Sequence, residues 1–86
     1  MRLFYFNGVH GWSEQDEQWV AEFPNNYGVS IIRNPMSYGF SEDLYELAVL
    51  RDGSLDYTTP ITDDVIGHLT WDEAWALMME VEALNE

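Results

Sequence analysis

The sequence contains no cysteine and no lysine. Without cysteine the chain has no disulfide, no thiolate metal site and no cysteine nucleophile, which fits a reducing compartment. It also lacks an apolar run close to the ~20 residues that a membrane span needs, and its N-terminus does not resemble a signal peptide. We therefore expect a cytoplasmic protein without a membrane partner.

The lack of lysine leaves three arginines against sixteen carboxylates, with a formal net charge of -13. Such a field repels nucleic acid and anionic membranes, and it attracts basic surfaces. Arg2, Arg33 and Arg51 are too few to form a basic patch, so direct binding of DNA or RNA is excluded. The charge therefore indicates a basic partner protein.

Apolar residues make up 47% of the chain and aromatic residues 15%, which is enough for a folded core despite the charge. The 86 residues predict a single domain, spanning 1–86. Four tryptophans and five tyrosines exceed what a core of this size needs, so we expect some of them at the surface.

The first half of the chain predicts a strand, a helix and a second strand. Residues 1–9 are apolar on both faces, which is typical of a central or covered strand. Ser13 and the acidic residues after it predict a helix over residues 14–23. β-branched residues predict a strand over residues 29–33, and residues 34–43 read as a connecting loop.

The second half predicts a hairpin followed by a connector. Residues 44–50 form a long apolar strand pattern, and Asp52-Gly53 is a strong hairpin signal that predicts a return strand over 55–58. Residues 61–69 read as a connector.

A C-terminal helix is predicted over residues 71–84, because Thr70 and Glu73 fit a capping box. Its apolar stripe follows helical spacing and consists of Ala74, Leu77, Met78, Val81 and Leu84. The element order is then β-α-β-β-β-α. We expect an α+β fold with a three- to four-stranded, mostly antiparallel sheet and two helices packed on one side.

The acidic residues are the first candidate for a binding site. Carboxylates three or four positions apart on a helix lie ~5–6 Å apart, a spacing similar to that of phosphates along a DNA strand. A rigid display of them would gain the salt-dependent attraction that DNA has for basic proteins. The residues expected to contact the partner are Asp63, Asp64, Asp72, Glu73 and Glu80, with Glu14 and Glu17 behind them. The alternative is an acidic surface that serves solubility.

Aromatic residues outside the predicted core are the second candidate. Tyr38 and Phe40 lie in the predicted loop, and Trp75 flanks the apolar stripe of the C-terminal helix. Exposed aromatic and methionine side chains mark protein interfaces. This favours an alternative function as a small interaction module, with homodimer formation left open.

Metal binding and catalysis have weaker support. Asp63, Asp64 and Asp72 offer hard carboxylate ligands and His68 offers an imidazole, but their spacing matches no recognised metal site. His10 has no nucleophile or orienting carboxylate at a recognisable spacing. We expect no metal, no cofactor and no enzymatic activity.

Residues 27–69 carry a resemblance to known sequences. The pieces are Tyr27-Gly28-Val29, Ile32-Arg33-Asn34-Pro35, Ser37-Tyr38-Gly39, Leu44-Tyr45-Glu46 and Thr59-Pro60-Ile61-Thr62-Asp63-Asp64-Val65-Ile66-Gly67. In these pieces the chain resembles small uncharacterised proteins encoded by phages and prophages. The resemblance implies a bacterial host cell, and it implies no activity or site residues.

In size and charge alone, the chain is also similar to phage anti-restriction and anti-CRISPR inhibitors, some of which imitate DNA. This similarity implies an inhibitor that occludes the nucleic-acid-binding surface of a host or defence protein.

Overall fold

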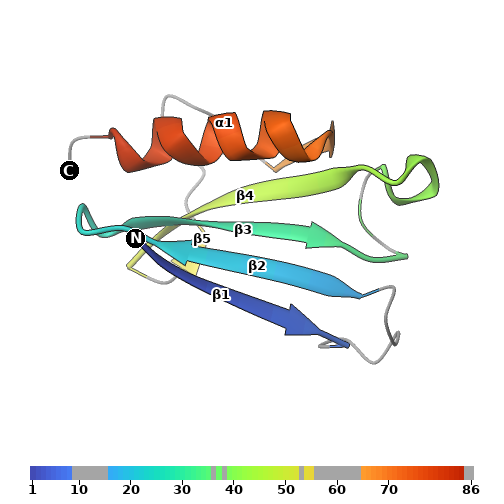
Figure 1. The fold of residues 1–86 in the computed structure, drawn as a ribbon. Helices are drawn as coiled ribbons and strands as arrows, with labels where there is room; N and C mark the ends of the chain where they lie inside the picture. The colour runs from blue at the N-terminus through green and yellow to red at the C-terminus, as the bar shows by residue number, and fades with distance from the viewer. Residues whose placement is uncertain (9–15, 36, 38, 53, 56–64, 85–86) are drawn as a thin grey trace.

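The computed structural model describes residues 1–8, 16–35, 37, 39–52, 54–55 and 65–84. In this part of the chain an antiparallel sheet packs against one α-helix (Figure 1). The strands are β1 (Arg2–Asn7), β2 (Glu17–Glu22), β3 (Tyr27–Arg33), β4 (Tyr45–Arg51), β5 (Ser54–Leu55) and β6 (Ile66–Leu69). The helix is α1 (Trp71–Glu82), and a short 3-10 helix, η2 (Phe40–Glu42), precedes β4.

The sheet follows the order of the chain. Strands β1 to β5 lie side by side in sequence order, and β6 also pairs with β4. Every pairing is antiparallel. The prediction of two helices on a sheet of three to four strands is therefore wrong, because the described residues form a larger sheet with one α-helix.

The predicted helix over residues 14–23 is wrong in its described part, where residues 17–22 form β2. Trp19 and Ala21 point toward α1 and Val20 points to the other face, with the period of two that a strand imposes. Strands β1 and β3 pair with β2 along both of its edges. This pairing outweighs the helix-start signal of the acidic residues, since local propensity is a weak term.

The prediction that the first strand is central or covered is also wrong. Strand β1 lies at the edge of the sheet, and its one partner among the described residues is β2. All six of its residues are exposed. Apolar residues on both faces of this strand therefore reflect exposure on both faces and not burial.

The core lies between α1 and the middle of the sheet. Helix α1 packs over β3, β4 and β6, while β1 lies at the far edge (Figure 1). The most buried side chains come from both layers and include Ala21, Val29, Ile31, Leu47, Val49, Ala74, Met78 and Val81. The predicted apolar stripe of the helix is confirmed, with Leu77 and Leu84 partly buried at its margins.

The hairpin prediction holds at its turn, because Arg51 pairs with Ser54 and leaves Asp52 and Gly53 between them. Asp52 has φ 52°, the left-handed conformation of such turns. Residues 56–58 lie outside the described residues.

The connector prediction is wrong for Ile66–Leu69, which form β6. The register of β6 against β4 shifts between its two paired positions, and His68 has φ 56°. Such an irregular strand lacks the alternation by which strands are identified in a sequence.

Candidate functional site

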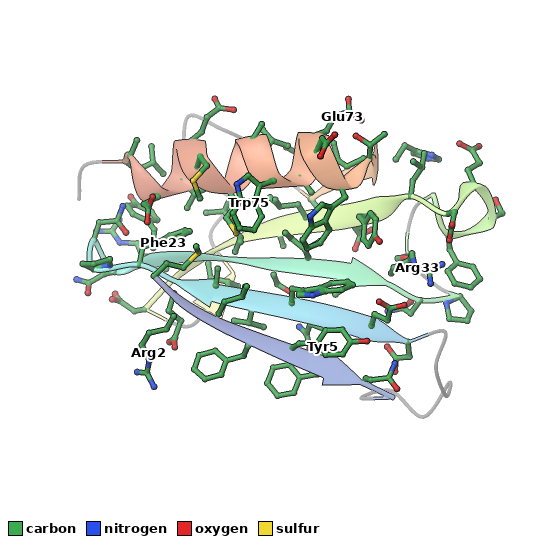
Figure 2. All side chains as sticks on the ribbon, in the orientation of Figure 1. Arg2, Tyr5, Phe23, Arg33, Glu73 and Trp75 are labelled. Carbon is green, nitrogen blue, oxygen red and sulfur yellow. The ribbon has the colours of Figure 1, made fainter. Side chains whose placement is uncertain are left out.

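The solvent side of α1 is acidic. Asp72, Glu73, Glu80 and Glu82 are exposed, and the last turn of the helix carries no basic residue. At 1.5 Å per residue, Asp72 and Glu80 lie about 12 Å apart along the helix axis. These four residues extend around the solvent side from Glu73 on one flank to Glu82 on the opposite flank, and we call them the acidic helix face. Figure 2 shows Glu73 on the side of α1 that faces away from the sheet.

Glu73 also holds the start of the helix. Its carboxylate accepts a hydrogen bond from the Thr70 amide at 2.9 Å, and its own amide donates to the Thr70 hydroxyl at 3.2 Å. Hydrogen bonding with Thr70 lowers the pKa of the Glu73 carboxyl below its usual value. The predicted capping box is therefore confirmed, and Glu73 keeps its charge at the positive end of the helix dipole.

Arg33 gathers a second group of predicted residues away from α1. Its guanidinium donates to Glu17 at 3.0 Å and to Asp43, and it lies 5.7 Å from the centre of the Phe40 ring. The hydrogen bond with Glu17 raises the pKa of Arg33 above its usual value. Glu17 and Phe40 thus have a partner within the chain, and Arg33 offsets part of the negative charge of Glu17.

A row of aromatic rings crosses from the sheet to the helix. Tyr5 lies 5.0 Å from Trp19, Trp19 lies 4.9 Å from Trp71, and Trp71 lies 6.3 Å from Trp75, measured between ring centres. Tyr45 packs beside Trp19 and Trp71, and burial raises the pKa of its phenol. Such tilted and edge-on contacts are favourable for aromatic pairs. The two ends of the row are exposed: Tyr5 on β1, and Trp75, which is 38% exposed, on α1.

The N-terminal strand forms the most apolar exposed surface of the described residues. Met1, Leu3, Phe4, Tyr5 and Phe6 are each between 37% and 53% exposed. We call these five residues the aromatic edge. Sequence analysis missed it because the same apolar pattern is found in buried strands. The absence of any carboxylate among the first thirteen residues of so acidic a chain is the signal that marks this segment.

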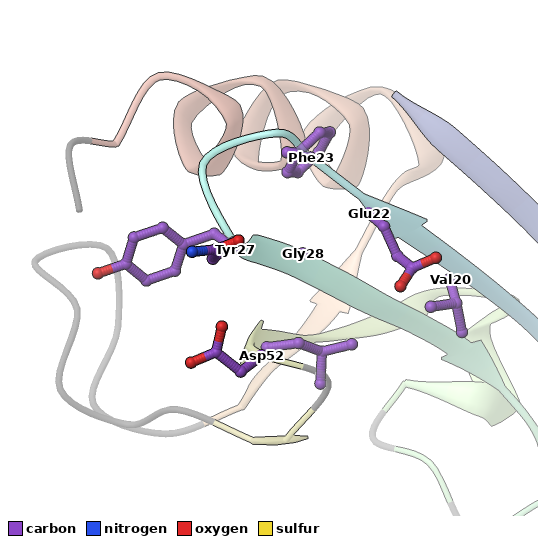
Figure 3. Close-up of a pocket in the computed structure, with 8 residues that line it drawn as sticks. Val20, Glu22, Phe23, Tyr27, Gly28 and Asp52 are labelled. Atoms are coloured by element: carbon purple, nitrogen blue, oxygen red, sulfur yellow. The ribbon is translucent and has the colours of Figure 1, made fainter.

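A pocket of about 380 Å³ lies where the β2–β3 turn meets the end of β4 (Figure 3). Val20, Leu50 and Gly28 form part of its wall, and Glu22 and Asp52 supply carboxylates. The pocket therefore combines an apolar wall with two carboxylates. A side chain at position 28 would push β2 and β3 apart, because a Cβ there would lie 2.4 Å from the Ala21 carbonyl oxygen.

Four of the predicted contact residues, Glu14, Tyr38, Asp63 and Asp64, lie outside the described residues. Of the others, Asp72, Glu73 and Glu80 come together on α1 and Trp75 lies at the flank of the same helix. Glu17 and Phe40 belong to the separate Arg33 group.

The metal hypothesis is tested at two of its four residues. His68 Nδ1 lies 3.8 Å from Glu42 Oε2, while Asp72 belongs to the acidic helix face. Among the described residues no group of three or more His, Cys, Asp or Glu is arranged to hold a metal ion.

Comparison with known proteins finds no matching protein family, no similar curated protein and no similar solved structure. In the part of the chain that the structure describes, no helix has the length and apolar character to span a membrane.

Proposed function

We propose that this chain is a non-catalytic binding protein that occupies the basic, nucleic-acid-binding surface of another protein. The observation that carries the proposal is the acidic helix face. Four exposed carboxylates share one capped helix whose last turn has no basic residue, in a chain with a net charge of -13. Attraction between this helix and lysine or arginine side chains favours the encounter of the two proteins. In the complex the same groups form charge-assisted hydrogen bonds.

The rigidity of α1 supports this role. Its inner side chains Ala74, Met78 and Val81 are fully buried, and the capping box fixes its first turn. The backbone that carries these carboxylates is ordered before binding, so only their side-chain rotamers remain to be fixed when the partner arrives. A flexible acidic tail would lack this advantage.

Trp75 supplies an apolar contact beside the charges. It is exposed on the same helix and packs against Trp71, and this contact helps to fix the position of its ring. A tryptophan in this position is suited to be an interface anchor, because aromatic side chains contribute large contact areas at low entropic cost.

The setting we propose is a bacterial cytoplasm and the role is that of a phage-type inhibitor. By occluding the groove of a host or defence protein, the chain would imitate the charge of DNA without binding DNA itself. The resemblance of residues 27–69 to phage and prophage proteins supports this setting, and the charge supports the mode of binding.

The test compares two sets of charge-neutralising substitutions. One variant carries Asp72→Asn, Glu80→Gln and Glu82→Gln, and it leaves Glu73 in place so that the helix cap is kept. The matched control carries Glu22→Gln, Glu46→Gln and Asp52→Asn, which remove the same charge from other elements.

Each immobilised protein is used to capture partners from a bacterial lysate, followed by washing with salt or with duplex DNA. We expect wild type and control to retain a nucleic-acid-binding protein that both washes release, and the α1 variant to lose it. Equal capture by the two variants would refute the role of the acidic helix face.

A second candidate function is an interaction module that uses the aromatic edge. This function is favoured by the exposure of Met1 and of four large apolar residues on the edge strand β1. Edge strands with unpaired backbone groups are templates for pairing with another strand. Binding there should hold or tighten as salt rises, which is opposite to the behaviour expected of the acidic helix face.

A further inference from the structure

Among the described residues β1 has a partner strand on one edge only, and the backbone groups that point to its outer edge can be assigned to particular residues. The Gly8 amide donates to the Asp16 carbonyl at 2.7 Å, and the pairing of β1 with β2 continues in the same register up to Arg2 and Glu22. In an antiparallel pair, hydrogen-bonded and non-hydrogen-bonded positions alternate. The amides and carbonyls of Leu3 and Tyr5 therefore point away from β2, toward the outer edge.

Charge favours a second copy of this chain at this edge. Residues 1–13 contain no carboxylate, and Arg2 is the one charged side chain of β1. Two copies, each with a net charge of -13, therefore approach with the least repulsion along β1. A basic strand would gain no ion pair from β1 itself, because the carboxylates lie on other elements.

Symmetry restricts the register in which two copies can pair. A two-fold axis between two antiparallel β1 strands stands perpendicular to the sheet. Each residue is therefore paired with a residue of the second copy whose side chain lies on the same face of the sheet. Pairing Leu3 with Tyr5 of the second copy uses the outward amides and carbonyls of both residues. The same register places Phe4 against Phe4 of the second copy on the axis, and Arg2 beside Phe6, a favourable cation–π pair.

We propose that β1 pairs with β1 of a second copy in this register, giving a symmetric dimer with one continuous sheet. This inference concerns the aromatic edge and is independent of the role proposed for the acidic helix face. Both copies of α1 then lie on the same side of the joined sheet. At ~4.8 Å per strand, their axes are about 30 Å apart, so the dimer presents two acidic helices to one partner.

The dimer is expected to be weak and reversible. At about 200 Å² per large aromatic side chain, the exposed parts of Phe4, Tyr5 and Phe6 amount to roughly 270 Å² per copy. This is well below the ~800 Å² per partner of a standard interface. Charge repulsion weakens the dimer further, so its population should increase with protein concentration and with salt.

Sedimentation of the full chain from micromolar to millimolar concentration, at low and high salt, tests the dimer. The variant Leu3→Pro removes an outward amide that makes no bond to β2, and we expect it to weaken dimerisation about tenfold or more. Leu3→Ala is the matched control, since it shortens the side chain but keeps the amide. Circular dichroism establishes that both variants are folded.

Single-cysteine variants test the register, because the chain has no cysteine of its own. Phe4→Cys should form a disulfide-linked dimer under mild oxidation, since the two Phe4 positions meet at the axis. Phe6→Cys should not, since it faces Arg2. The triple α1 variant should still dimerise through β1, and more readily than wild type at low salt because it carries less repulsive charge. Retained dimerisation with lost partner capture separates failure of the proposed function from failure of the dimer.

Three results would overturn the proposal. A chain that stays monomeric at millimolar concentration and high salt would leave the edge to a strand of a different protein. A dimer that Leu3→Pro does not weaken would not be formed through β1. Cross-linking of Phe6→Cys without Phe4→Cys would show a different register.

Discussion

Helix α1 and strand β1 present opposite chemistry at the surface of one small fold. The outer side of α1 is acidic, while its inner side is buried against the sheet. Strand β1 carries no carboxylate, and all its residues are exposed. Net charge therefore describes this chain poorly, because charge and exposed apolar area lie on different elements. The two surfaces should therefore respond to salt in opposite directions.

The attachment of the two elements to the core also differs. Helix α1 buries several side chains over β3, β4 and β6. Strand β1 is joined to the fold by its pairing with β2 and by the contact of Tyr5 with Trp19. Mutations can thus weaken one element more than the other.

Removing the central anchor of α1 should have the largest effect. Met78 is fully buried, and Met78→Ala is expected to lower the free energy of unfolding by about 2–5 kcal/mol, since it leaves a cavity under the helix. Urea denaturation followed by circular dichroism measures the change. Met79→Ala, at a partly buried position next to it, should cost less; equal losses would mean that the helix packs differently.

Crowding the contact between β2 and β3 should have the next largest effect on stability. Gly28→Ala places a Cβ 2.4 Å from the Ala21 carbonyl oxygen, so the two backbones must separate, at an expected cost of about 1–3 kcal/mol. Because β2 holds β1, amide hydrogen exchange should speed up in both strands more than in α1. As a control, Ser30→Ala removes the hydrogen bond from Gln18 but introduces no clash. Faster exchange confined to α1 would contradict this order of attachment.

Removing the helix cap should lower stability by a smaller amount, through α1 alone. Thr70→Ala should lower stability by about 1 kcal/mol, because it removes the acceptor for the Glu73 amide. Thermal denaturation of Thr70→Ser, which keeps the hydroxyl, should stay close to that of wild type. A loss as large for Thr70→Ser as for Thr70→Ala would assign the effect to packing of the methyl group.

The cap also predicts a dependence on pH. The pKa of Glu73 is lower in the folded chain than its usual value, so the ionised carboxylate stabilises the fold above the unfolded pKa. This contribution is lost as the pH falls through the folded pKa. Denaturation of wild type and Glu73→Gln should therefore differ most near neutral pH and converge in acid. A difference that grows in acid would contradict the assigned role.

The smallest effect on stability is expected at Trp75. Because its side chain is partly exposed on α1, Trp75→Ala should change the free energy of unfolding far less than Met78→Ala does. The substitution should instead reduce partner capture. That measurement tests whether the Trp75 ring anchors the partner beside the acidic helix face. Unchanged capture together with unchanged stability would remove Trp75 from the proposed interface.

The sequence predicted α1 because its cap and its buried stripe are both local patterns of residues 70–84. It also predicted strands at the positions of β3 and β4, where β-branched and aliphatic residues are frequent. It failed at β2, where the acidic residues resemble a helix start but the segment pairs with the preceding strand on one edge and the following strand on the other. Pairing with another strand is not encoded in the residues of the segment itself, so local propensity could not reveal it.

The candidate site was predicted in part for the same reason. Asp72, Glu73 and Glu80 share a helix face by their spacing alone, so sequence reasoning could group them. The internal pairing of Glu17 with Arg33 depends on the register of β2 and β3, which the sequence does not show. The aromatic edge depends on β1 lying outermost in the sheet, which is a property of topology.

The most direct test of the two-surface account follows both surfaces in one salt titration. Sedimentation would report self-association, and fluorescence anisotropy would report binding of a labelled lysine-rich peptide. We expect self-association to strengthen and peptide binding to weaken as salt rises, and we expect the triple α1 variant to lose peptide binding while it keeps self-association. Two responses that change in the same direction, or a variant that loses both kinds of binding, would contradict the assignment of charge to α1 and apolar contact to β1.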